Sequence, residues 1–153
     1  MTSHRNPSFV ETGTKMSAYL VIVTNSDDPD TLGIMFDSGT SDARLGCAVF
    51  YGQALINADS TAFLRTSAHE LGHQFNLHHL DGTTYVENGV TKFTIMNQTG
   101  TIQDSVGGWT AAVSFKFGDH ETSHLSNHPD SNVKPGGSNF STCNTEHQGW
   151  HTL

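Results

Sequence analysis

The sequence lacks the features that mark several classes of protein. Its longest apolar run, Ala18 to Val23, is strand-sized and far shorter than a membrane span. Basic residues are few, with 7 Lys and Arg against 15 Asp and Glu. The resulting net charge of −8 argues against nucleic acid or an anionic membrane as a partner. The N-terminal residues contain no apolar segment typical of a secretory signal, so none is expected in the chain as given.

Cysteine is scarce, whereas glycine is abundant. The two cysteines, Cys47 and Cys143, permit one disulfide, but two unpaired thiols fit the sequence equally well. With 153 residues, 35% of them apolar, and 15 glycines, the chain is long enough to bury a core and is expected to be rich in loops. This composition favours a single-domain enzyme or binding module over a helical bundle.

Strand patterns precede a long helical pattern. Three segments combine β-branched and aromatic residues with flanking turn residues, and we predict strands at residues 18–24, 31–37 and 46–54. A helix is predicted from Thr61 to Asn76. A second helix is expected at Gly118–His128, with Asp119 as its N-cap, and the chain from Pro129 onward is expected to be irregular.

The first predicted helix has two distinct faces. Three residues before it could serve as its N-cap: Asn57, Asp59 and Ser60. At helical spacing, four apolar residues form one stripe, which we expect to pack on the sheet: Leu64, Ala68, Leu71 and Phe75. His69 and His73 lie on nearly the opposite side, so we expect them to face a cleft.

The segment HELGH carries the strongest chemical signal. His69 and His73 are four residues apart, so a helix places both rings where they can bind one metal ion. Glu70 projects beside the ion rather than onto it, where a general base can take a proton from an attacking water. A metal site is therefore predicted, with a solvated polar helix face as the alternative.

The pattern continues beyond the helix. His79 follows His73 by six residues, so the chain must leave the helix and bend back to bring it to the same ion. Asn76 stands where this bend is required, and asparagine tolerates left-handed backbone angles better than other non-glycine residues. We predict that His69, His73 and His79 bind one Zn²⁺ and leave an open position for water.

HELGHQFNLHH resembles the extended zinc signature HExxHxxGxxH of the metzincin metallopeptidases, with Asn76 in place of the usual glycine. That family also has a methionine in a tight turn beneath the metal. Met96 in FTIMNQTG, seventeen residues after His79, matches it as a packing residue and not a ligand. An ordinary core methionine is the alternative for Met96.

The resemblance implies a fold and an activity. It implies an α+β (α/β) catalytic domain over residues 1–153, with a small twisted mixed sheet packed on the active-site helix (1–76) and an irregular lower subdomain with one helix (77–153). The first predicted strand resembles an inner strand, and the second resembles the rim strand that pairs with extended substrate. The implied function is that of a secreted zinc endopeptidase acting on protein or peptide, with Glu70 as general base.

The sequence also departs from the family. Family domains begin with another strand, a helix and a further strand, whereas only some seventeen residues precede the first predicted strand, so a truncated N-terminal part is expected. Leu80 follows the third histidine and matches no subfamily, and no tyrosine follows Met96. These departures motivate an alternative: a zinc-binding module of similar fold without peptidase activity.

Other histidines are weaker candidates. His78 adjoins His79, but its neighbour has the required spacing. Three further histidines recur every four residues: His120, His124 and His128. They could form a second metal face, but a solvated helix face is the preferred interpretation.

Acidic residues offer two more alternatives. The segment Asn25–Asp30 could bind Ca²⁺, which some metzincins carry, but it lacks the ligand spacing of a known calcium loop, so a plain turn is preferred. Asp81 could replace His79 as the third zinc ligand, as in other HExxH enzymes. His79 remains the preferred ligand.

Overall fold

The computed structural model describes residues 16–37, 44–79, 84–103, 112–128 and 130–140. It contains both helices and small sheets, which confirms the α+β class. The strands are β1 (Tyr19–Val23), β2 (Gly33–Phe36), β3 (Gly46–Phe50), β4 (Thr84–Glu87) and β5 (Val90–Phe93). The helices are α1 (Ala54–Ala58), α2 (Ser60–Gln74), α3 (Thr99–Gln103), α5 (Asp119–Asn127) and α6 (Asp130–Val133).

The main sheet is mixed and has the order β1-β3-β2. Strand β1 runs parallel to β3, and β2 runs antiparallel to it, with Ala48 of β3 opposite both Val21 and Ile34. Among the described residues β1 therefore forms one edge of the sheet, and its expected place as an inner strand is wrong. Strand β2 forms the other edge, as predicted for a rim strand.

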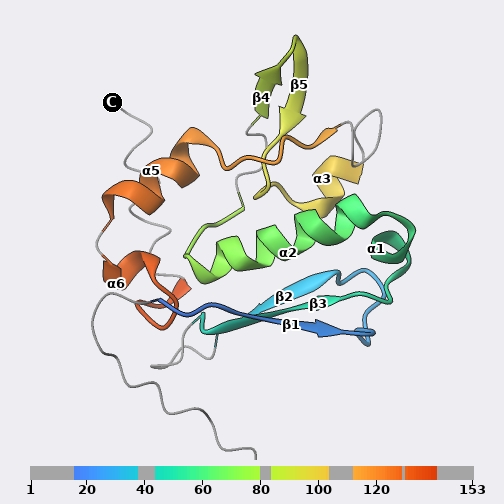
Figure 1. Cartoon of the computed structure of the whole chain (residues 1–153), viewed down its shortest axis with the longest axis horizontal. Coiled ribbons are helices and arrows are strands. Elements are labelled where there is room, and N and C mark those ends of the chain that lie inside the picture. The colour runs from blue at the N-terminus through green and yellow to red at the C-terminus, as the bar shows by residue number, and fades with distance from the viewer. Residues whose placement is uncertain (1–15, 38–43, 80–83, 104–111, 129, 141–153) are drawn as a thin grey trace, which may run out of the picture.

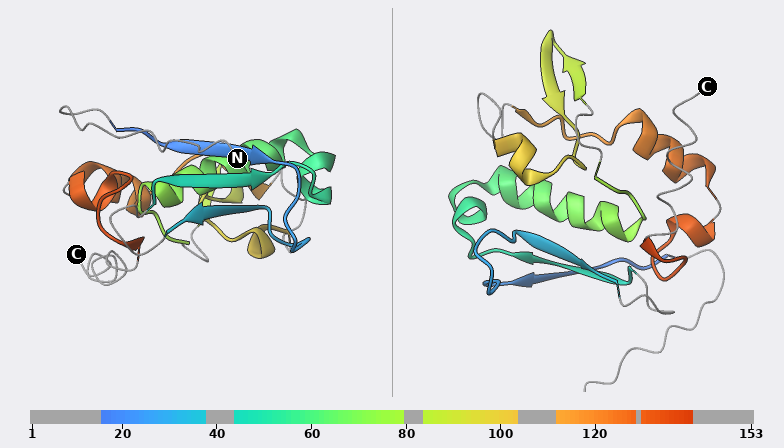
Figure 2. Two further views of the ribbon diagram at one scale, coloured as in Figure 1. Left: turned by 90° about the horizontal axis from the view of Figure 1, so that it is seen from below. Right: turned by 180° about the vertical axis from the view of Figure 1, so that it is seen from behind.

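Helix α2 crosses the middle of the molecule between two layers. The sheet lies along one side of it, and α3, α5 and the segment between β5 and α3 lie along the other (Figures 1 and 2). One apolar cluster joins the sheet to α1, α2 and α3 and includes Leu32, Val49, Ile56, Ala62 and Ile102. On the far side a second cluster joins Ala68 to Leu77, Ile95 and Met96.

Because α2 is covered on both sides, its predicted apolar stripe is wrong as a sheet-packing surface. Leu64 is 59% exposed, and Ala68 packs in the second cluster, away from the sheet. Buried Gln74 instead faces the sheet, where its amide bonds to both main-chain groups of Tyr19 and donates to the thiol of Cys47. Hydrogen bonds thus allow a polar side chain to lie where the periodicity predicted an apolar one.

Helix boundaries differ slightly from their predictions. Asp59 is the N-cap of α2, because its side chain accepts a hydrogen bond from the Thr61 amide at 2.8 Å, and α2 ends at Gln74. In α5, Gly118 is the N-cap and Asp119 is the first helical residue, so the predicted cap is wrong by one position. No helix among the described residues has the length and apolar character needed to cross a membrane.

Three short helices and one hairpin were not predicted: α1, α3, α6 and β4–β5. The hairpin turns at Asn88 and Gly89, whose φ angles are 54° and 78°. An Asn-Gly pair with two positive φ angles is the preferred tight hairpin turn, so this pair was a usable signal in the sequence.

Arg44 joins the C-terminal segment to the end of α2. This arginine is fully buried, and its guanidinium donates to Gln74 O at 2.7 Å. It also donates to three carbonyls of the C-terminal segment, those of Val133, Lys134 and Ser138. One side chain therefore fixes residues 133–138 against the helix that carries the predicted ligands.

Candidate metal centre

The end of α2 bends the chain in the way the sequence predicted. Asn76 has a φ of 64°, the left-handed conformation. Its amide donates to His73 O at 2.9 Å, and the next amide, of Leu77, donates to Gly72 O at 3.1 Å. These two bonds form the Schellman motif that closes many helices. The prediction that Asn76 ends the helix and turns the chain back is confirmed.

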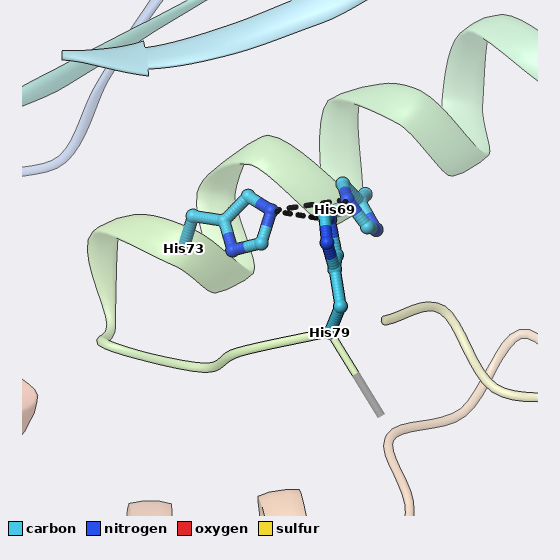
Figure 3. Close-up of side chains that lie close together, drawn as sticks. All are labelled: His69, His73 and His79. Atoms are coloured by element: carbon cyan, nitrogen blue, oxygen red, sulfur yellow. Dashed lines mark hydrogen bonds between the residues drawn. The ribbon is translucent and has the colours of Figure 1, made fainter. Parts of the chain in front are cut away.

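The bend brings His79 to the two histidines of the helix, as Figure 3 shows. The Nε2 atom of His69 lies 2.9 Å from that of His79 and 3.0 Å from that of His73, and the remaining pair is 3.1 Å apart. His69 and His73 are buried and His79 is exposed. All three predicted ligands therefore point one nitrogen each at a common centre.

Main-chain carbonyls lie behind two of these rings. His69 Nδ1 lies 2.8 Å from Ile95 O, and His73 Nδ1 lies 2.7 Å from Leu77 O. A carbonyl oxygen can only accept, so both Nδ1 atoms carry the proton. In the neutral rings the Nε2 atoms that face each other then have lone pairs and no hydrogen.

Burial keeps these rings neutral. It lowers the pKa of His73 to about 4 and the pKa of His69 well below its usual value. Neutral Nε2 atoms about 3 Å apart repel through their lone pairs unless a cation lies between them. Because a tetrahedral zinc ion with about 2.0–2.1 Å bonds separates its ligand nitrogens by about 3.3 Å, the triad fits such an ion. The cluster can therefore hold one divalent metal.

Glu70 lies beside the triad and is not one of its members. Its side chain is 6% exposed and packs against Gly33 of β2, where an added Cβ would lie 2.6 Å from Glu70 Cγ. Glycine at position 33 thus leaves room for the carboxyl group. Burial raises the pKa of Glu70 to about 7, although the positive charge of Arg65 opposes the rise.

Arg65 was not predicted and is completely buried on the same helix. Its guanidinium donates to Asn97 O and, at 3.0 Å, to Thr99 Oγ1. Burial lowers its pKa to about 10, so it stays charged at neutral pH. Arg65 therefore fixes the segment after Met96 to α2 and places a positive charge near Glu70. Helical spacing alone gave no sign of this contact, because its partners lie more than thirty residues away.

Met96 lies against α2 at Gly72, which stands between His69 and His73 in the sequence. It is fully buried, and its sulfur would lie 2.5 Å from a Cβ added at Gly72. The absence of a side chain at Gly72 lets the methionine contact the helix backbone. Met96 is therefore a buried packing residue of the second apolar cluster, as expected both for the methionine of the resemblance and for an ordinary core methionine.

A cleft of about 290 Å³ opens beside the triad. His69, Glu70 and His79 line one side of it, and Thr31 to Gly33 at the start of β2 line another. Strand β2 pairs only with β3 among the described residues, so its other edge is open to an extended chain. The cleft thus combines metal-ligating nitrogens, a buried carboxyl group and an available strand edge.

Among the described residues, no other histidine joins this centre. The ring of His78 stacks on Phe140 at a centroid distance of 4.0 Å. His124 is buried, so the prediction of a solvated face is wrong for it, and its ring lies 4.6 Å from that of His128. Among the described residues, the only cluster of three or more possible ligands is the His69, His73 and His79 triad.

The acidic segment before β2 forms a turn. Asp28 Oδ1 accepts from the Asp30 amide, and Asp28 Oδ2 accepts from the Thr31 hydroxyl at 2.6 Å. Both carboxylate oxygens of Asp28 therefore accept hydrogen bonds within the turn, in agreement with the preferred prediction of a plain turn. Cys47 is a buried free thiol, and three residues that carried predictions lie outside the described residues: Leu80, Asp81 and Cys143.

Comparison with known proteins gives no match: no protein-family model, no curated protein and no solved structure matches the chain. The interpretation of this centre therefore depends on its own geometry.

Proposed function

We propose that the protein is a zinc-dependent endopeptidase with a metzincin-like fold. One observation carries the proposal: three Nε2 atoms within 3.1 Å of one another lie beside a buried carboxyl group in a cleft bordered by an open strand edge. A triad of histidines leaves a coordination position open, as catalytic zinc sites do, whereas structural zinc has four protein ligands. The resemblance of HELGHQFNLHH to the metzincin signature extends the proposal to secretion of the protein.

In the proposed reaction His69, His73 and His79 hold the zinc ion. When bound there, zinc supplies Lewis acidity toward water and the peptide carbonyl. Glu70 accepts a proton from the attacking water and then donates it to the departing amine. A pKa of about 7 suits both transfers, because the carboxyl group exchanges a proton readily near neutral pH.

The β2 edge positions the substrate in this proposal. An extended peptide that pairs with Gly33–Phe36 receives main-chain hydrogen bonds and does not depend on any one side chain. The peptide then passes the mouth of the cleft, which Thr31 and Gly33 share with Glu70 and His79. Burial of Glu70 keeps bulk water from competing for its proton.

The decisive test replaces Glu70 by glutamine, which keeps the shape of the side chain and removes the base. We expect hydrolysis of casein or of a peptide library to fall by about 10²–10⁴-fold, while zinc content measured by mass spectrometry stays equal to that of the wild type. Glu87→Gln is the matched control, because Glu87 lies on hairpin β4–β5 and binds Lys92 and Lys116. Wild-type rates in Glu70→Gln would rule out Glu70 as the base.

A second candidate function is a zinc-binding module without peptidase activity. The outer face of the sheet favours it, because five large apolar side chains there are exposed by more than a third: Tyr19, Val21, Val23, Ile34 and Phe36. Among the described residues the sheet has three strands and this exposed apolar face, which is consistent with a reduced catalytic half. Stoichiometric zinc without cleavage of any library peptide supports this alternative, whereas chelator-sensitive cleavage excludes it.

A further inference from the structure

The three histidines differ in what holds them in place. Main-chain carbonyls of Ile95 and Leu77 orient His69 and His73, and no side-chain substitution removes a carbonyl. His79 is the exposed member and lies beyond the helix. A side-chain group lies next to its Nδ1 atom: Nε2 of the Gln98 carboxamide is 3.2 Å away. A side-chain substitution can therefore remove this support of His79, whereas it cannot remove the carbonyls behind His69 and His73.

Gln98 reaches His79 from the segment that supports the rest of the centre. It follows Met96 and Asn97, and the Asn97 carbonyl accepts from buried Arg65. The Asn97 side chain in turn accepts from the Thr94 amide at 2.7 Å. On the other side of Gln98, the Thr99 hydroxyl also accepts from Arg65, so the main chain that carries Gln98 is fixed on both sides, although the Gln98 side chain itself is exposed.

We propose that Gln98 is a positioning residue for His79, and that its carboxamide sets the orientation and tautomer of that ring. When Nε2 of His79 faces the metal, Nδ1 carries the proton and donates it to Gln98. A half-turn of the terminal amide exchanges Nε2 for Oε1 at this position, so that the oxygen accepts the Nδ1 proton. The proposal depends on the zinc-binding part of the proposed function and not on peptide hydrolysis.

The exposure of the Gln98 side chain sets how much its substitution should lower zinc affinity. Loss of a group behind a metal ligand lowers metal affinity by about 10–100-fold. Because Gln98 is exposed, water replaces part of its hydrogen bond, so the effect of Gln98→Leu is expected at the lower end, about tenfold. Gln98→Glu keeps an acceptor oxygen and adds a negative charge near the ion, so its affinity for zinc is expected to equal or exceed that of the wild type.

The test measures zinc affinity of the full chain by competition with a chromogenic chelator, together with exchange of the histidine Nδ1 protons by NMR in the zinc-loaded protein. In Gln98→Leu the His79 proton should exchange faster, while the His69 and His73 protons keep their rates. Asn127→Leu is the control, because it removes an exposed amide that donates to Ser123 on α5. A purely structural effect of residue 98 would change all three rings and would not be rescued by glutamate.

The outcomes separate the two proposals. Wild-type protein that retains no zinc overturns the proposed function and this inference together. Wild-type protein that binds zinc, with Gln98→Leu equal to it in affinity and exchange, overturns only the role of Gln98. Weaker binding by Gln98→Leu and rescue by Gln98→Glu support that role whether or not the protein cleaves peptides.

Discussion

The residues before and after Asn76 are held together by different interactions. The sheet half, residues 16–37 and 44–76, has a three-stranded sheet, one long helix and most of the larger apolar cluster. The loop half, described between residues 77 and 140, has short elements joined by buried polar side chains that bind main-chain groups. The clearest examples are Arg44, Arg65, Asn97 and Glu121. Both arginines come from the sheet half, so that half supplies much of the order of the other.

This difference means that single polar substitutions should affect the loop half most. The largest effect is expected for Arg44→Met, which leaves buried carbonyls of Gln74 and the C-terminal segment without their donor. A buried acceptor without a partner costs about 1–3 kcal/mol, so we expect the free energy of unfolding to fall by about 3–5 kcal/mol in total. Urea unfolding followed by circular dichroism measures it.

Leu64→Lys is the control for Arg44→Met. It changes an exposed residue of α2 that the sequence pattern had placed in the core, and a change within about 0.5 kcal/mol is expected. If Arg44→Met also stays within 1 kcal/mol, the C-terminal segment does not depend on this guanidinium, and the contrast between the halves is weaker than described.

A smaller effect is expected at the junction of the halves. Asn76→Ala puts an ordinary residue at a φ of 64° and removes the bond from Asn76 Nδ2 to Asn132 O, so a loss of about 2 kcal/mol is expected. Asn76→Gly removes the same bond but adopts the angle without strain, so it should cost about 1 kcal/mol less. Thermal and urea unfolding of both variants measures the difference.

The same two variants, Asn76→Ala and Asn76→Gly, should also differ in their affinity for zinc. Because His79 follows the bend, Asn76→Ala should weaken zinc binding more than Asn76→Gly does. Equal stability and equal affinity in the two variants would show that the left-handed conformation is not what places the third ring.

The smallest effect concerns pH. Burial raises the pKa of Glu121, whose carboxylate accepts from the Thr94 hydroxyl and the Gly118 amide. The folded state therefore binds this proton more tightly than the unfolded state, so the Glu121 contribution to stability falls as pH rises above about 4.5. Glu121→Gln should remove that part of the pH dependence.

Glu87 provides a control whose contribution to stability depends on pH in the opposite direction. Lys116 and Lys92 lower the pKa of Glu87, so its contribution is lost as pH falls, and Glu87→Gln should remove a dependence in that direction. Unfolding measured between pH 4 and 8 compares the variants. The same slope for Glu121→Gln and the wild type would contradict the assignment to Glu121.

Residue spacing predicted the histidine triad because its three members lie close together in the sequence. The positions of His69, His73 and His79 follow from one helix and one bend, and Asn76 identified the bend. Contacts distant in the sequence could not be predicted in this way. Ile95 behind His69, Gln98 behind His79 and the partners of Arg65 all depend on how the loop half folds.

The predicted face of α2 was wrong for a related reason. Hydrophobic periodicity identifies one buried side of a helix, but α2 is covered on two sides. On the sheet side Gln74 is buried through hydrogen bonds to Tyr19 and Cys47, which no pattern of apolar residues shows. The Asn88-Gly89 hairpin was different, because its signal was present in the sequence.

The carbonyl oxygens of Leu77 and Ile95 have a consequence for how the chain gains its structure. They aim the imidazoles only after the bend and the segment beneath α2 are in place, so an unfolded chain offers scattered histidines and no common centre. Any cation that prefers the assembled rings must shift the equilibrium between unfolded and folded chains. Occupancy of the centre and conformational stability are then thermodynamically linked, and ion supply acts on both.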